Sequence, residues 1–144
     1  MKKIILIIVS LCVVLYADTE LAEPKPSFDN PRKIIFTITE DSEYALSHIL
    51  STANNVLKVY GPENVDMKIV AYSKGIKLLL KENISRVKRV ETLMQYDVMF
   101  IACKNTMRTK NIDENDLIDG TEVVTAGVVE LIERIKLGWV YIKP

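Results

Sequence analysis

Apolar and polar positions along the chain follow two different periods, and these predict alternating strands and helices. Residues 33–39 form a β-branched run of strand length. After Asp41 or Ser42, either of which can cap a helix, apolar residues recur at helical spacing until Gly61 and Pro62 stop the pattern. The members of this helical stripe are Leu46, Ile49, Leu50, Ala53, Leu57 and Tyr60. The domain is therefore expected to open with a strand followed by a long amphipathic helix.

The rest of the chain repeats this alternation. The further predicted strands are 65–72, 98–103, 122–125 and 139–142. The further predicted helices are a short one over 75–81, one through Val87, Val90 and Met94 to near Tyr96, one over 105–110 and one from Val128 to Gly138, with a turn at 113–117. This order predicts an α/β fold, namely a single three-layer domain with about five mainly parallel strands and helices on both faces.

The N-terminal residues differ in character from the rest. Two lysines precede an apolar run over 4–16, and acidic residues follow Ala17. This charge order predicts a signal peptide over 1–17, cleaved after Ala17. The proline-rich, polar stretch 18–32 predicts a flexible arm. The folded domain is therefore expected at 33–144.

Two alternatives to a cleaved leader are disfavoured. As a membrane anchor, a helix over 4–16 would span only about 20 Å, against a hydrocarbon core of about 30 Å. Lipidation of Cys12 would need a small residue before it, where Leu11 stands. No second long apolar run occurs in the sequence. We therefore expect a periplasmic or secreted protein that has no membrane contact once the leader is removed.

Charge and cysteine content narrow the possible functions. The chain has 144 residues, with 19 Lys and Arg against 19 Asp and Glu, so its formal net charge is zero. This balance argues against a nucleic-acid binder held by a broad basic surface. Of the two cysteines, only Cys103 remains once 1–17 is removed, so no disulfide can form within one mature chain. In an oxidising compartment such a thiol is buried and inert, paired between chains, or kept for chemistry.

Cys103 is the candidate chemical group. It ends a predicted strand just before a predicted helix, and ligands of open parallel sheets bind beyond such strand ends. Backbone N–H groups at a helix N-terminus favour a thiolate, and Lys104 adds a neighbouring positive charge. Asn105 and Thr106 can cap the helix or donate hydrogen bonds to a bound anion or to the sulfur. The alternative is that Cys103 only fills the core, as most free cysteines do.

Other candidates are weaker. The only histidine, His48, falls on the polar side of its predicted helix, which disfavours a Cys–His hydrolase. Glu40 and Asp41 follow the first strand, where helix capping is favoured over catalysis. Asn83 begins an Asn-Ile-Ser glycosylation sequon, a weak signal. Since no glycine-rich phosphate loop, Cys-x-x-Cys pair or zinc-spaced cluster occurs, neither a metal nor an organic cofactor is expected.

Several stretches of the chain are similar to the DsrE/DsrF-like family, in particular to its secreted members. The most specific are Ala-Cys-Lys-Asn-Thr-Met at 102–107, Ala-Gly-Val-Val-Glu-Leu-Ile at 126–132 and Gly-Trp-Val-Tyr-Ile at 138–142. Shorter ones lie at 38–41, 54–58, 61–64 and 69–72. The resemblance covers nearly the whole of 33–144. It implies a small α/β fold and a homo-oligomer, often a trimer or hexamer.

The resemblance also implies a function. The best-understood members of the family carry sulfur as a persulfide on a strand-end cysteine, and Cys103 matches that cysteine. Asn105, Thr106 and Met107 match the motif around it. This chain is therefore expected to be an exported sulfur carrier of sulfurtransferase type, which accepts sulfane sulfur on Cys103 and passes it to a partner thiol. The relay members are largely cytoplasmic, so the leader leaves the donor and acceptor proteins open, and many relatives have no assigned enzymatic activity.

A second hypothesis is a non-catalytic, oligomeric binding module. Its strand ends would hold a small anion or a partner protein, and Cys103 would have only a structural role. Replacing Cys103 by serine would then leave binding intact, which distinguishes the two hypotheses.

Overall fold

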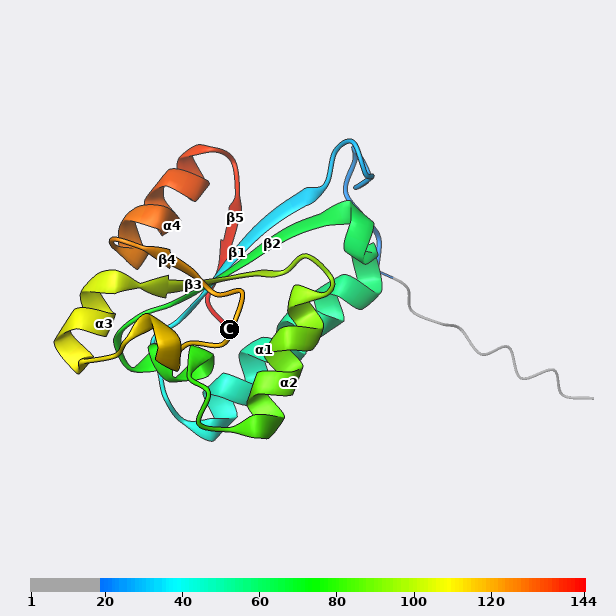
Figure 1. Ribbon diagram of the computed structural model, residues 1–144. Coiled ribbons are helices and arrows are strands. Elements are labelled where there is room, and N and C mark those ends of the chain that lie inside the picture. Colours follow the sequence, from blue (N-terminus) through cyan, green and yellow to red (C-terminus); the bar gives the residue numbers. More distant parts are fainter. Residues whose placement is uncertain (1–18) are drawn as a thin grey trace, which may run out of the picture.

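The structure is a computed structural model that describes residues 19–144, in which five parallel strands form one sheet with helices on both faces (Figure 1). This confirms the predicted fold class. The elements in chain order are β1 (Arg32–Ile38), α1 (Glu43–Tyr60), the 3₁₀ helix η1 (Pro62–Asn64), β2 (Val65–Ala71), the 3₁₀ helix η2 (Ser73–Leu79), α2 (Ile84–Met94), β3 (Met99–Cys103), α3 (Lys104–Lys110), the 3₁₀ helix η3 (Glu114–Asp116), β4 (Glu122–Val124), α4 (Gly127–Lys136) and β5 (Val140–Ile142).

The strands lie in the order β4-β3-β2-β1-β5, and every neighbouring pair is parallel. The chain moves from β1 to β4 one strand at a time and then returns past β1 to place β5 at the other edge. Because parallel crossovers are right-handed, the outward steps put their helices on one face and the return step puts α4 on the other. Figure 1 shows α4 above the sheet, with α1 and α2 below it.

The two faces of the sheet bury unequal amounts of apolar surface. Alternate residues of β1 point to opposite faces, so Phe36 packs in the large cluster under α1 and α2 while Ile35 packs toward α4. On the α4 side the buried apolar residues are Ile35, Val70, Ile101 and Leu131. A single helix therefore covers the face opposite α1, α2 and α3.

The helix ends follow the local sequence. Ser42, rather than Asp41, caps α1, because its side-chain oxygen accepts a hydrogen bond from the Ala45 N–H at 3.2 Å. Gly61 ends α1 with a φ of 81°, a conformation that glycine adopts without steric cost. Asn83 of the sequon is the N-cap of α2.

One element differs in kind from its prediction. The stretch 75–81, predicted as a short helix, is instead η2, a 3₁₀ helix that starts two residues earlier, at Ser73. The element ends before Leu80, which pairs with Leu117 in an isolated β-bridge. Three of its side chains, Ile76, Leu78 and Leu79, are at most 2% exposed. Packing against the core therefore favours the tighter 3₁₀ geometry over the predicted helix.

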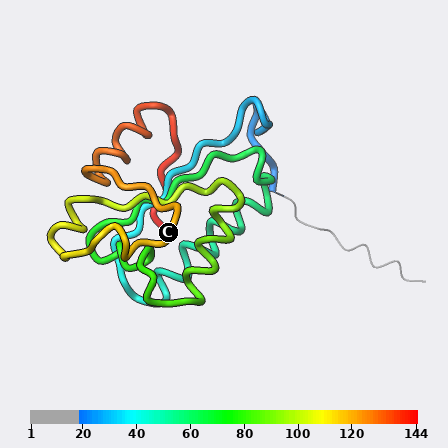
Figure 2. Tube along the Cα trace, viewed as in Figure 1, coloured from blue at the N-terminus to red at the C-terminus, as the bar shows by residue number. Residues whose placement is uncertain are grey.

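Residues 19–31 precede the sheet at the amino ends of its strands, opposite α3 (Figure 2). They contain no helix, and Ser27 pairs with Asn30 in a short turn. The predicted signal peptide over 1–17 lies outside the described residues. No helix in the described part of the chain is long and apolar enough to cross a membrane.

Candidate functional site

The carboxyl ends of β3 and β4 lie side by side, and the helices that follow them go to opposite faces of the sheet. β3 ends at Cys103, which pairs with Val124 at the end of β4. α3 then runs on the α1 side, whereas α4 crosses the other face. In open parallel sheets, this point of divergence is the usual position for a ligand. Cys103 therefore occupies the place in the fold where binding or chemistry is most expected.

Four hydrogen-bond donors surround the Cys103 sulfur. Backbone N–H groups of Asn105 and Thr106 come from the first turn of α3, and the Gly127 N–H comes from the start of α4. The fourth donor is the Thr106 hydroxyl. Its Oγ1 accepts a hydrogen bond from the Ser73 N–H at 3.1 Å, so its own proton remains available for the sulfur. Donors from two helix N-termini therefore converge on one thiol and favour its anionic form.

Burial and hydrogen bonding change the acidity of Cys103 in opposite directions. The residue is only 6% exposed, and burial raises the pKa of the thiol because the thiolate loses solvation. The hydrogen bonds from Gly127, Thr106 and Asn105 lower the pKa and together outweigh burial. The net result is a thiol whose pKa lies below its ordinary value. Such a cysteine has more thiolate near neutral pH than an unperturbed one.

Gly127 is the site residue that sequence reasoning missed. A Cβ at this position would lie 2.9 Å from Val70 Cγ1 and 3.4 Å from Cys103 Cβ. The absence of a side chain therefore lets the first turn of α4 approach the sulfur. The available signal was the Ala-Gly pair at 126–127, placed between a strand and an amphipathic helix.

Of the two roles that the sequence suggested for Asn105 and Thr106, donation to the Cys103 sulfur is the one found, and helix capping is not. Asn105 and Thr106 do not cap α3, because the helix starts at Lys104 and Cys103 is the N-cap. Asn105 is exposed, and its backbone N–H also donates a hydrogen bond to the Thr125 carbonyl at 3.2 Å, which links the end of β4 to α3. Lys104 pairs with Glu114 at 3.2 Å and is not among the groups that lower the pKa of Cys103.

His48 does not join the thiol. It is exposed on α1 and stacks on Tyr44, with ring centroids 5.4 Å apart. With Glu40 it lines a cavity of about 210 Å³ at the carboxyl end of β1, and Cys103 does not line that cavity. The structure gives no hydrogen bond between His48 and Cys103, so a Cys–His pair is not assembled. Within residues 19–144, no three His, Cys, Asp or Glu side chains are grouped as metal ligands.

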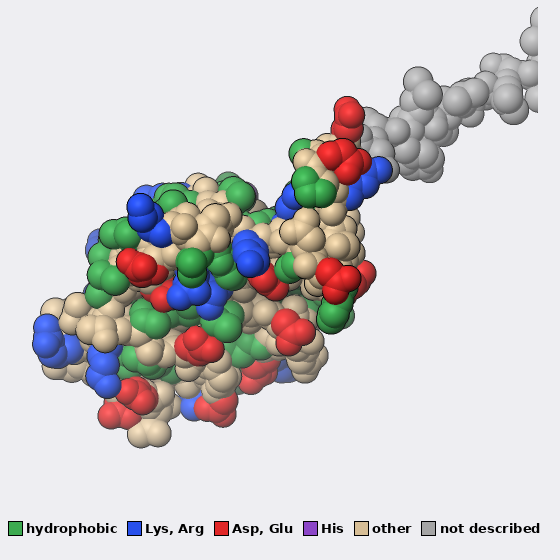
Figure 3. Space-filling model, turned by 90° about the horizontal axis from the view of Figure 1, so that it is seen from above, with side chains coloured by type: hydrophobic (Ala, Val, Ile, Leu, Met, Phe, Trp, Pro, Cys, Tyr) green, Lys and Arg blue, Asp and Glu red, His purple; other side chains and the backbone are tan. Residues whose placement is uncertain are grey.

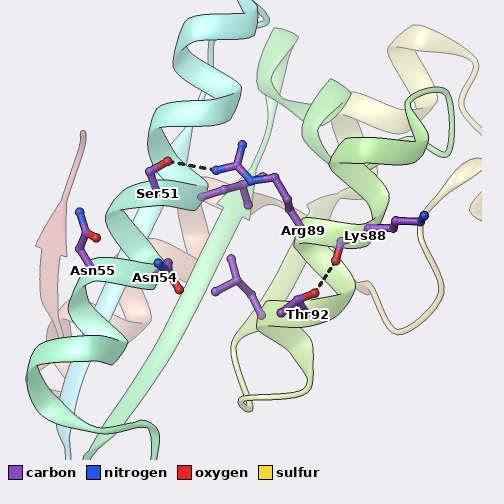
Figure 4. Close-up of a pocket in the computed structure, with 8 residues that line it drawn as sticks. Ser51, Asn54, Asn55, Lys88, Arg89 and Thr92 are labelled. Atoms are coloured by element: carbon purple, nitrogen blue, oxygen red, sulfur yellow. Dashed lines mark hydrogen bonds between the residues drawn. The ribbon is translucent and has the colours of Figure 1, made fainter.

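Two further cavities differ in their relation to Cys103. One of about 670 Å³ lies beside α3 and includes Asn105 and Thr125, which adjoin the thiol through the contacts above. The other, of about 350 Å³, lies between α1 and α2 (Figure 4). There Arg89 donates to Ser51 Oγ at 3.0 Å, and no cysteine, histidine or carboxylate lines the space. Of these two cavities, only the one beside α3 is lined by residues next to the Cys103 sulfur.

Replacing Thr106 by valine is expected to raise the pKa of the Cys103 thiol. Valine keeps the shape of threonine but removes the hydroxyl that donates to the sulfur, so the thiolate loses one of four stabilising donors. The pH midpoint of iodoacetamide alkylation of the folded protein should therefore rise. Thr106→Ser retains the hydroxyl and should restore a midpoint close to that of the wild type. An unchanged midpoint in Thr106→Val would mean that the hydroxyl does not act on the sulfur.

The fold and the site together define a class of protein: a small parallel α/β domain with a hydrogen-bonded thiol at the point where the connections diverge. Residues 32–144 match the model of the DsrE/DsrF-like family, and the chain belongs to that family. This confirms the family resemblance seen in the sequence. No match was found among the curated proteins.

Solved structures from three organisms are similar to this chain. MTH1491 from Methanobacterium thermoautotrophicum, a protein of unknown function, has 33% identity and a TM-score of 0.74, covering 78% of this chain and 99% of its own. The ychN protein from E. coli has 21% identity and a TM-score of 0.66, covering 78% and 99%. BT1422 from Bacteroides thetaiotaomicron, also of unknown function, has 14% identity and a TM-score of 0.57, covering 78% and 94%. The last two support the fold alone.

Proposed function

We propose that this protein is an exported sulfur carrier that holds a sulfane sulfur on Cys103 as a persulfide and passes it to a partner thiol. The observation that carries the proposal is the convergence of donors from Asn105, Thr106 and Gly127 on the Cys103 sulfur. Family membership supports it, because the DsrE/DsrF-like family is generally linked to sulfur relay. The partner thiol belongs to a second protein, since Cys103 is the only cysteine of the sequence outside 1–17.

Loading requires a nucleophilic sulfur. The Cys103 thiolate attacks the terminal sulfur of a donor persulfide, R–S–SH. A new S–S bond forms to Cys103 while the donor S–S bond breaks, and the donor leaves as the thiolate R–S⁻. The proton stays on the transferred sulfur, and no external oxidant or reductant is consumed. The lowered pKa of Cys103 raises the thiolate fraction available for this attack.

Discharge uses the same hydrogen bonds in the opposite role. An acceptor thiolate attacks the terminal sulfur of the persulfide, the S–S bond to Cys103 breaks, and Cys103 leaves as a thiolate. A thiol of lower pKa leaves faster, so the donors from α3 and α4 that help loading also help release. The small exposure of Cys103 favours reaction with a sulfur presented on a slender chain over bulky reagents.

Export is the part of the proposal that rests on the leader alone. The charge order of 1–17 is that of a signal peptide, and removal after Ala17 would leave a mature chain that begins at Asp18. Donor and acceptor would then be found in the periplasm or outside the cell.

The intact mass of the mature protein, taken from its native compartment without reductant, tests this function. We expect the mass of one or two added sulfur atoms, removed by dithiothreitol and absent from Cys103→Ser. Polysulfide treatment of the bare protein should restore the added mass in the wild type only. The same spectrum should show a chain that starts at Asp18.

The binding module with a structural Cys103 predicts a different spectrum. In that case the mature protein carries a bare thiol, and the thiol stays bare after polysulfide treatment. That outcome would exclude the carrier and leave the fold and family unchanged. A chain that retains 1–17 would exclude a cleaved leader without bearing on the sulfur chemistry.

A further inference from the structure

The cavity between α1 and α2, here called the α1–α2 groove, is not lined by Cys103 and takes no part in the sulfur chemistry. Its volume of about 350 Å³ is within the usual range of small-molecule sites. Its base is formed by Leu50 and Leu93, which are at most 4% exposed. Its polar lining residues are Ser51, Asn54, Asn55, Lys88, Arg89 and Thr92. An apolar base with a few polar side chains above it is typical of a ligand site.

Arg89 crosses the α1–α2 groove and is held there by the opposite helix. Figure 4 shows its side chain reaching from α2 to Ser51 on α1. The guanidinium donates to Ser51 Oγ at 3.0 Å, to Ser47 Oγ at 2.8 Å and to the Ser47 carbonyl at 3.1 Å. At most three of its five N–H donors are used in this way, so at least two remain for a ligand. Because the guanidinium is already fixed, binding costs little further side-chain entropy.

The positive charge of Arg89 is not neutralised by the part of the chain that the structure describes. Arg86, one turn earlier on α2, also reaches α1 and pairs there with the Glu43 carboxylate at 2.8 Å. Arg89 meets only neutral serine and carbonyl oxygens on the same helix, and it forms no ion pair with any described residue. Lys88 is exposed and likewise forms no ion pair within residues 19–144. The α1–α2 groove therefore carries two uncompensated positive charges.

This excess of positive charge differs from the rest of the chain. Seen from above the view of Figure 1, the molecule has Lys and Arg side chains interspersed with Asp and Glu (Figure 3). The whole sequence has 19 residues of each sign. The lining of the α1–α2 groove, by contrast, includes Lys88 and Arg89 and no carboxylate. A hollow lined by charge of one sign raises the local concentration of the opposite ion, so this groove favours an anion.

Asn54 provides a second kind of donor. It follows Ser51 by three residues on α1, so the two side chains lie on the same side of the helix. The Asn54 side chain is exposed and makes no hydrogen bond to any described residue, so its amide N–H groups are free to donate. Thr92 differs, because its hydroxyl donates to the Lys88 carbonyl at 2.7 Å. Arginine and asparagine are both side chains that donate to phosphate oxygens.

We propose that the α1–α2 groove binds the phosphate group of a small organic phosphate ester. The phosphate oxygens accept hydrogen bonds from Arg89 and Asn54, and the charge of Lys88 adds attraction at the edge of the groove. The organic part lies against the base formed by Leu50 and Leu93, in a space larger than a single phosphate ion needs. This inference is independent of the sulfur-carrier proposal.

Calorimetric titration of the purified protein with phenyl phosphate, and separately with inorganic phosphate, tests this site. We expect phenyl phosphate to bind saturably and more tightly than inorganic phosphate. Arg89→Gln removes the guanidinium and should raise the dissociation constant at least about tenfold, the usual effect of losing a charged hydrogen-bond donor. Arg108→Gln removes the same charge from an exposed position on α3 and should leave the dissociation constant within about twofold, because salt screens distant charges.

Asn54→Asp separates ligand binding from any contribution of Arg89 to folding. Aspartate keeps the shape of asparagine, and the Asn54 side chain has no hydrogen-bond partner among the described residues, so the fold should be retained. The new carboxylate repels the phosphate and neutralises Arg89, so binding of phenyl phosphate should be lost.

The proposal would be overturned by a wild type that binds neither probe, or by Asn54→Asp binding phenyl phosphate as well as the wild type does. Equal losses of affinity in Arg89→Gln and Arg108→Gln would also overturn it, since they would show an unspecific response to net charge. Equal affinity for the two probes would assign the α1–α2 groove to free inorganic phosphate instead of an ester.

Discussion

Gly75→Ala is expected to lower the free energy of unfolding by roughly 3 kcal/mol or more, the upper range for an overpacked core. A Cβ on Gly75 would overlap the Ile38 carbonyl group and lie 2.7 Å from Thr39 N. These are backbone atoms at the end of β1, so no flexible side chain can move aside. Either η2 or the end of β1 must shift, and η2 carries side chains that are almost fully buried.

Gly138→Ala is the matched control for this substitution. Gly138 has a φ of 83°, and a Cβ added there would have no neighbouring atom within 4 Å, so alanine meets only the left-handed backbone penalty of about 1 kcal/mol. Gly75 lies outside that φ range, and its cost is entirely steric. Equilibrium urea unfolding of both variants measures the difference. Equal losses would show that η2 yields easily and that the close approach to β1 is not needed.

Local sequence signals predicted the fold well because most of its elements are determined locally. Residues 33–39 and 98–103 are apolar and β-branched enough to indicate buried strands, and the stripe of α1 has clear helical spacing. The alternation of these elements then implies a parallel sheet with right-handed crossovers. The ends of the elements differ from the predicted ends by one or two residues, because capping by Ser42 and Cys103 depends on backbone geometry.

The site was only partly predictable because its donors come from separate parts of the chain. Position at a strand end identified Cys103, and proximity in sequence suggested Thr106. Gly127 and Ser73, however, approach the site only through the packing of α4 and η2 around β3. The predicted effect of the Lys104 charge on the thiol was not found for the same reason, because Lys104 forms an ion pair with Glu114, ten residues later. Sequence spacing alone cannot specify such contacts.

The last helix shows a second limit of pattern analysis. Apolar residues at Val128, Leu131, Ile132 and Ile135 correctly predicted an amphipathic helix. The pattern does not say which apolar residues face the sheet, and in the structure only Leu131 of these four is buried. The orientation of α4 on the sheet decides which of its residues are buried. The crossover from β4 to β5 sets that orientation.

Cys103 is expected to react in the folded protein at a lower pH than in the unfolded one. Hydrogen bonds from Gly127, Thr106 and Asn105 lower the pKa of the folded thiol, whereas the unfolded thiol keeps its ordinary pKa. Because the thiolate is the reactive form, the pH midpoint of iodoacetamide alkylation should be lower in the native protein than in the same protein unfolded in urea. Because Cys103 is only 6% exposed, restricted access of the reagent lowers the plateau rate of alkylation in the folded protein, whereas the midpoint reports the pKa of the thiol.

The same pKa difference predicts how stability depends on pH. Between the folded and the unfolded pKa of Cys103, the unfolded chain binds more protons than the folded one, so the free energy of unfolding rises with pH across that window. The contribution is complete above the unfolded pKa and is lost as the pH falls through the folded pKa. Cys103→Ala lacks the group, so the difference in unfolding free energy between wild type and variant should grow as the pH rises through the window.

Urea unfolding of wild type and Cys103→Ala at several pH values measures this difference, and alkylation measures the midpoint independently. A difference that stays flat or shrinks with rising pH would mean that burial outweighs the donors and that the thiol remains neutral. The persulfide would then lose the electrostatic support on which the carrier proposal depends. A growing difference together with a low alkylation midpoint would establish that α3 and α4 stabilise a negative sulfur at Cys103, which both loading and release require.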